Sequence, residues 1–206
     1  MSCPKQSECP MSENYGIPDF DPTEAIEGYA SSPIWVIGIN QKTTPERHIS
    51  GKPSPTTWKD TDPDAPHFRR LKQVLGDEWY PHLFKLGGIA HTDLLKCGSP
   101  GYTKVEISSV PHCRDFLIEQ VCKYKPKLLL IVSSAASRFI SETAMLNGKT
   151  EGVWKYKSDE ECFVVFSGYT GPRQDRFAKY RLNKDFLAAC ARLNLCPPNH
   201  TIEKRS

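Results

Sequence analysis

Four short apolar runs alternate with amphipathic segments along the chain and predict the strands of one sheet. The runs occupy residues 34–39, 89–95, 128–132 and 162–167, and a hairpin partner at 153–157 precedes the last one. Apolar side chains at helical spacing predict helices at 68–75, 113–124 and 173–193. Strands that alternate with helices build parallel sheets covered on both faces. We therefore expect an α/β fold: a three-layer α/β/α sandwich with a central, mostly parallel four-stranded sheet.

Two polar stretches interrupt this pattern. Residues 1–32 form a proline-containing arm without periodicity, and residues 41–66 form a polar loop of 26 residues between the first strand and the first helix. A connection of that length is uncommon unless it is functional. We expect a single domain over 1–206, with its ligand at the carboxyl ends of the parallel strands.

The composition narrows the class of protein. Hydrophobic residues make up 38% of the chain, the mean hydropathy is −0.49, and no apolar run is long enough to cross a bilayer. The first residues lack the apolar core of a secretory signal. We expect a monomeric cytoplasmic protein with no membrane partner. The net charge of +3 and the pI near 8.4 are compatible with nucleic-acid binding.

Cysteines are the most informative residues of the chain. Cys97 ends the second apolar run and Cys113 begins the next helix, so both thiols are expected at one sheet edge, within reach of Cys3 and Cys9 on the arm. Four convergent thiolates ligate zinc or an iron-sulfur cluster. The spacings, five and fifteen intervening residues, differ from the tight knuckles of zinc sites and favour the iron-sulfur cluster over zinc. The alternative is ordinary buried thiols, as we expect for Cys122, Cys162, Cys190 and Cys196.

Five sequence blocks, taken together and in order, resemble the uracil-DNA glycosylase superfamily. They are "IWVIGIN", "HFRRLKQVL", "GIAHTDLLKCGSPG", "KPKLLLIVSSAA" and "VVFSGYTGPRQ", within residues 33–187. The Lys96-Cys97 pair, followed by Cys113, is similar to the branch that holds a four-iron four-sulfur cluster. The Gly38-Ile39-Asn40 segment looks more like the mismatch-specific glycosylases. The resemblance implies a DNA repair enzyme that flips a base into a pocket at the strand ends.

The resemblance also assigns roles to individual residues. Asn40 matches the residue that orients the hydrolytic water, although an Asn after a strand also serves as a turn residue. For stacking on the base we consider Trp58 and Phe68, the latter also fitting a helical core pattern with Leu71 and Leu75. Arg173 opens a basic helix that suits entry into the duplex, or it belongs to a solvated surface. The catalytic candidates are Asn40, Tyr169 and Thr170, and the substrate-binding candidates are Gly38, Ile39, Gln41, Trp58, Phe68, Asp93, Ser167 and Arg173.

This chain departs from the superfamily pattern at three places. Gln41 stands where a Pro-Gly pair is usual, and residues 167–173 replace a segment that usually contains His. Leaving-base assistance then falls to Tyr169, Thr170 or backbone N–H groups. Asp93 stands where an Asn reads the base, and a carboxylate only accepts hydrogen bonds. Either burial raises the pKa of Asp93, or the preferred base is not uracil, or Asp93 is exposed and paired with His91 or Lys96.

The sequence is compatible with three functions. The first is a DNA glycosylase with a structural four-iron four-sulfur cluster. The second is a catalytically weak nucleic-acid-binding or damage-sensing protein on the same fold, which the three departures favour. The third is a zinc-containing enzyme that acts on a free nucleoside.

Overall fold

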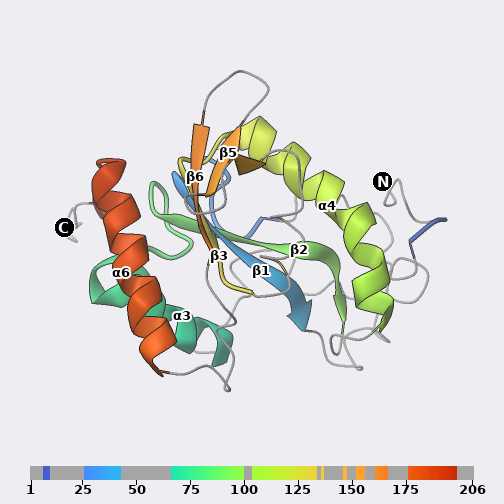
Figure 1. The fold of residues 1–206 in the computed structure, drawn as a ribbon, viewed down its shortest axis with the longest axis horizontal. Helices are drawn as coiled ribbons and strands as arrows, with labels where there is room; N and C mark the ends of the chain where they lie inside the picture. The colour runs from blue at the N-terminus through green and yellow to red at the C-terminus, as the bar shows by residue number, and fades with distance from the viewer. Residues whose placement is uncertain are drawn as a thin grey trace, which may run out of the picture.

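A six-stranded sheet forms the centre of the protein (Figure 1). The computed structural model describes residues 7–9, 26–42, 66–99, 104–133, 136, 146–147, 152–155, 161–166 and 176–198. The strand order is β2-β1-β3-β6-β5-β4. The bounds are Ile34–Lys42 for β1, Ile89–Ser99 for β2, Leu128–Ile131 for β3, Leu146–Asn147 for β4, Gly152–Lys155 for β5 and Glu161–Phe166 for β6.

The four strands β2, β1, β3 and β6 run parallel to one another and form the core of the sheet. Strands β5 and β4 extend it in antiparallel orientation, with β5 and β6 forming the predicted hairpin. All four residues of β3 are buried, as its continuous apolar sequence predicts. The predicted α/β class and the parallel four-stranded centre are confirmed.

In the described part of the chain, three long helices cover the two faces of the sheet. Helix α4 (Lys104–Tyr124) lies on one face, and α3 (Pro66–Trp79) and α6 (Arg176–Arg192) lie together on the other (Figure 1). Side chains of β1 alternate between these layers. Trp35 and Ile37 belong to the buried cluster that includes α4, here the α4-side core, and Ile34 and Val36 belong to the α3/α6-side core.

Helix α3 changes direction near its end. Gly76 has φ 75° and ψ 173°, which is not helical, so regular helix stops at Leu75, where the sequence predicts it. The Asn183 side chain of α6 donates a hydrogen bond of 2.8 Å to the Val74 carbonyl at this point. A short 3-10 helix, η3 (Tyr80–His82), then leads towards β2.

Several element bounds differ from the predicted ones. Pairs Asn40↔Leu95 and Lys42↔Ser99 prolong β1 and β2 across an irregularity in register. Helix α4 begins at Lys104, nine residues before the predicted start at Cys113, and tolerates Pro111 in its interior at the loss of one backbone donor. The 1–32 arm is also not wholly irregular, because Glu27 forms an antiparallel bridge with His91 of β2.

Candidate functional site

Three ionisable side chains meet beside the middle of β1 and the amino-terminal half of β2, level with the carboxyl end of β3, and we call them the strand-end triad: Glu27, His91 and Asp93. His91 and Asp93 are two residues apart on β2 and therefore project from the same face of the sheet. Glu27 and His91 exchange two backbone hydrogen bonds of 2.7 and 2.9 Å. This pairing brings Glu27 Oε2 to 2.6 Å from His91 Nδ1.

Gly38 of β1 makes room for the Asp93 carboxyl group. The two residues are register partners in the parallel pair β1–β2. A Cβ atom at position 38 would overlap Asp93 Oδ1 and would lie 3.2 Å from His91 Nε2. Any side chain larger than hydrogen at position 38 would therefore push Asp93 away from its place over β1.

Burial and mutual attraction shift the pKa values of the triad. Burial raises the pKa of Asp93 from 3.8 to about 6, against the opposing attraction of His91. Burial alone would lower the pKa of His91, but the charges of Asp93 and Glu27 and the hydrogen bond to Glu27 outweigh it, so the pKa rises above 6.5. The Asp93 carboxyl group therefore changes protonation at a pKa of about 6, and the His91 ring does so at a pKa above its ordinary 6.5.

The triad offers a hydrogen-bonding pattern that changes with pH. A carboxylate at Glu27 only accepts, so His91 Nδ1 keeps its proton and Nε2 is the atom that titrates. Nε2 lies 4.0 Å from Asp93 Oδ1, longer than a direct hydrogen bond. With His91 protonated, the two atoms form a donor beside an acceptor. With His91 neutral and Asp93 ionised, they form two acceptors.

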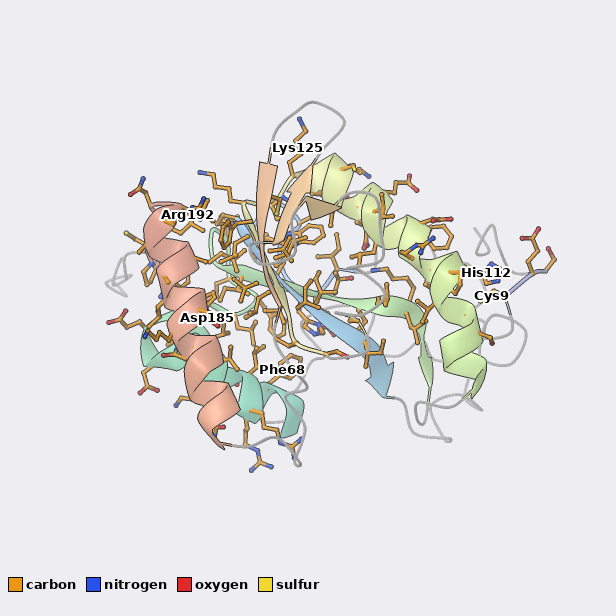
Figure 2. The ribbon with its side chains drawn as sticks, in the orientation of Figure 1. Cys9, Phe68, His112, Lys125, Asp185 and Arg192 are labelled. Carbon is orange, nitrogen blue, oxygen red and sulfur yellow. The ribbon has the colours of Figure 1, made fainter. Side chains whose placement is uncertain are left out.

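Phe68, labelled in Figure 2, lies on the first turn of α3 and contacts His91 of the triad. Its ring meets the His91 ring edge to face, with centroids 5.6 Å apart, and meets Phe84 in the same way at 5.4 Å. Phe68 is buried in the α3/α6-side core together with Leu71 and Leu75. The core alternative for Phe68 is therefore confirmed, and the same ring contacts His91 of the strand-end triad.

The cysteine site is described in part. Cys9 and Cys113 are both buried in the α4-side core, and Figure 2 draws Cys9 beside the turn of α4 that carries His112. Cys97 lies on the part of β2 near its end, and α4 packs on β2. Among the described side chains, no group of three His, Cys, Asp or Glu residues is arranged to hold a metal ion, and Cys3 and the side chain of Cys97 lie outside them. Two of the four predicted ligands, Cys9 and Cys113, thus belong to one buried cluster.

A buried lysine lies on the same face as these thiols. Lys96 Nζ donates hydrogen bonds of 2.8 Å to Thr92 Oγ1 and 2.6 Å to Gln120 Oε1 on α4. Burial lowers the pKa of Lys96 to about 7, while Asp93 and Cys113 both act to raise it. Lys96 therefore interacts electrostatically with both Asp93 of the strand-end triad and Cys113.

The remaining predicted site residues fall into two groups. Ile39 is partly buried against the α4-side core, and the backbones of Asn40 and Gln41 belong to β1. Outside the described residues lie Cys3, Trp58, Ser167, Tyr169, Thr170 and Arg173. Sequence reasoning missed Glu27 as a site residue, because only its distant pairing with β2 brings it to His91.

A scan against protein-family models and a search of curated proteins both gave no match. Over the ranges that the structure describes, every helix falls short of the length and apolar character that crossing a membrane requires.

Proposed function

We propose that this protein is a DNA repair glycosylase, which flips a damaged or deaminated base out of the helix and hydrolyses its N-glycosidic bond. The observation that carries the proposal is the strand-end triad, with the Asp93 carboxyl group over Gly38 and beside His91. Ligands of parallel sheets bind at this edge, and a flipped base is read by buried polar groups. The same strand ends carry two of the blocks that resemble the uracil-DNA glycosylases.

The triad reads the base through Asp93 and His91. Protonated His91 donates to a carbonyl oxygen while Asp93 accepts from the neighbouring N–H, which is the pattern of O4 and N3 in uracil. Neutral His91 beside ionised Asp93 instead accepts from two adjacent N–H groups, as on the N1 and N2 edge of guanine derivatives. The preferred base therefore changes with pH.

In this proposal, the catalytic groups are residues near the end of β1 and after β6 in sequence. Asn40, two residues after Gly38 on β1, orients the water that attacks the sugar, and Tyr169 and Thr170 assist the departing base. An oxocarbenium-like sugar needs a positioned water more than a strong base. Gln41, Trp58, Phe68, Ser167 and Arg173 complete the proposed substrate contacts.

We also assign a structural role to the cysteines. Cys3, Cys9, Cys97 and Cys113 would hold a four-iron four-sulfur cluster, with zinc as the second choice, and so fasten the arm to β2 and α4. Thiolate ligands need a reducing compartment, which is consistent with a monomeric cytoplasmic protein that acts on DNA. The bound group is structural in this proposal, and the reaction is carried by the residues at the strand ends.

The second candidate is a DNA-binding damage sensor without turnover. It is favoured by Asp93, which cannot donate to uracil O4 when ionised, and by Gln41 next to the water-orienting Asn40. This candidate shares the fold and the DNA partner and differs only in chemistry.

Base excision distinguishes the two candidates. Oligonucleotides with a single uracil, hypoxanthine, xanthine, mismatched thymine or oxidised guanine are incubated with the protein and cleaved at abasic sites by alkali. For the wild type we expect uracil excision to fall as pH rises and His91 loses the Nε2 proton that it donates to O4, because the pKa of His91 is raised above 6.5. Asp93→Asn keeps an acceptor for N3–H and adds an N–H donor for O4, so it should favour uracil and weaken this dependence on pH.

Two controls make the result decisive. Asn40→Ala should retain DNA affinity and lose on the order of a hundredfold in turnover, as expected for a positioned group in such a site. DNA binding by the wild type without excision of any of these bases would reject the glycosylase and support the sensor. A uracil preference unaffected by pH and by Asp93→Asn would remove the triad from base reading.

A further inference from the structure

Glu27 and Gly28 of the arm lie at the outer edge of β2, where their backbone is fixed beside the strand-end triad. Glu27 exchanges backbone hydrogen bonds of 2.7 and 2.9 Å with His91. Gly28 has φ 93°, and a Cβ atom at this position would lie 3.0 Å from Phe84 Cα, so the arm approaches the neighbouring backbone closely. Backbone pairing and close packing therefore hold position 27 in place independently of its side chain.

The Glu27 side chain contacts a histidine ring that is shielded from water. Glu27 Oε2 lies 2.6 Å from His91 Nδ1, and the two side chains are 15% and 5% exposed. The hydrogen bond at one ring nitrogen determines the role of the other. With Nδ1 bound to Glu27, Nε2 is the nitrogen that faces Gly38 and Asp93, 4.0 Å from Asp93 Oδ1. Glu27 thus sets the orientation of the ring towards the place where the base is read.

The charged groups around His91 act in opposite directions. Burial lowers the pKa of His91, Asp93 and Glu27 raise it, and Lys96 lowers it, with a result above 6.5. The described contact from α3 is the Phe68 ring, which carries no charge. Of the two carboxyl groups, Glu27 lies within hydrogen-bonding distance of the ring and Asp93 does not. Removing the charge of Glu27 should therefore lower the pKa of His91 even with Asp93 in place.

We infer that Glu27 is a positioning residue of the base-reading site, which holds His91 with Nε2 towards Asp93 and keeps this nitrogen protonated as a donor to the base. This role rests on the proposed function and assigns part of its specificity to the arm. A donor beside an acceptor matches O4 and N3–H of uracil, whereas cytosine has an amino group and an unprotonated nitrogen at the same two positions. Glu27 therefore favours the oxygen-bearing base and extends this preference to higher pH.

The test compares the full-length wild type with three variants. Glu27→Gln keeps an oxygen acceptor for Nδ1–H and removes the charge, and Glu27→Asp keeps the charge on a shorter side chain. Glu119→Gln makes the same chemical change at an exposed position of α4, away from the triad. NMR titration of the His91 ring gives its pKa and the nitrogen that carries the proton. Uracil excision, and affinity for otherwise identical oligonucleotides containing uracil or cytosine, are measured across the same pH range.

For Glu27→Gln we expect the pKa of His91 to fall by about 1 to 3 pH units, the usual effect of removing an opposite charge at this distance. The pH at which uracil excision falls should move down by the same amount. The ratio of affinities for uracil and cytosine should decrease over the same interval. Glu27→Asp should lie between Glu27→Gln and the wild type, and Glu119→Gln should match the wild type. A purely structural role of Glu27 would lower stability without moving these pH profiles.

Two results would overturn the role of Glu27. The first is an unchanged pKa of His91 in Glu27→Gln. The second is a lowered pKa that leaves both the pH profile and the affinity ratio as in the wild type. Failure of the proposed function is seen separately, because the titration and the affinity ratio still decide the role of Glu27 if the wild type excises no base. If Glu27→Gln does not fold, Glu27→Asp decides in the same way, since its withdrawn carboxylate should lower the pKa of His91 and move the affinity profile with it.

Discussion

Ionised Asp93 lowers the free energy of unfolding at neutral pH, which an Asp exposed to solvent would not do. Its folded pKa is about 6 and its ordinary value is 3.8, so folding favours the protonated carboxyl group. Its contribution to stability is therefore fully present below about pH 4 and is lost as pH rises towards 6. Retaining such a group at the strand ends is typical of a functional position.

Asp93→Asn should remove this dependence on pH. We expect the variant and the wild type to have similar free energies of unfolding near pH 4, and the variant to be more stable above pH 7 by on the order of 1–3 kcal/mol. Urea unfolding between these pH values measures the difference. Asp185, exposed on α6, provides the control substitution Asp185→Asn. Parallel stability curves for wild type and Asp93→Asn would contradict the cost assigned to Asp93.

Helices and strands show which structural features follow from local sequence. Continuous apolar runs predict β1 and β3 well, since burial on both faces needs no partner-specific information. Phe186, Ala189 and Cys190 of α6 are buried, whereas Leu187, next to Phe186 in sequence, is 40% exposed. The arm-to-β2 bridge depends on pairing between residues 64 positions apart. No local pattern encodes such a pair. The position of Glu27 beside His91, and its effect on the pKa of His91, could therefore not be predicted from the sequence.

The junction of α3 and α6 offers a test at the level of elements. Gly76 interrupts α3, and the Val74 carbonyl accepts from Asn183 of α6. Asn183→Ala removes this donor and should lower the free energy of unfolding by about 1 kcal/mol, with an unchanged dependence on urea. Lys184→Ala, at the exposed neighbouring position, should have almost no effect. Equal effects of the two substitutions would show that the hydrogen bond contributes little.

At the scale of the whole molecule, the described parts of the arm meet the sheet domain at two separate places. Glu27 pairs with β2, and Cys9 is buried in the α4-side core. Residues far apart in sequence are thereby joined around β2 and α4. A metal centre that includes Cys3, Cys9, Cys97 and Cys113 would make this attachment a condition for stable folding.

Anaerobically purified protein should therefore be brown and contain iron and acid-labile sulfide. Cys97→Ala should lose the colour and unfold at a lower temperature, because a ligand of the centre is missing. Cys190→Ala, which alters a buried thiol of the α3/α6-side core, should keep its metal. Stoichiometric zinc without iron would replace the iron-sulfur assignment, and a colourless, metal-free wild type would reject the site.

The Glu27 bridge has a consequence for how copies of the chain behave towards each other. Strand β2 is an outer strand of the sheet, and such a strand can pair with another molecule through its backbone. Phe84 donates to the Ile89 carbonyl, and Glu27 occupies both outward backbone groups of His91. These contacts leave fewer unpaired backbone N–H and C=O groups on the amino-terminal half of β2 with which a second chain could form hydrogen bonds. The arm thus opposes edge-to-edge aggregation while it completes the strand-end triad.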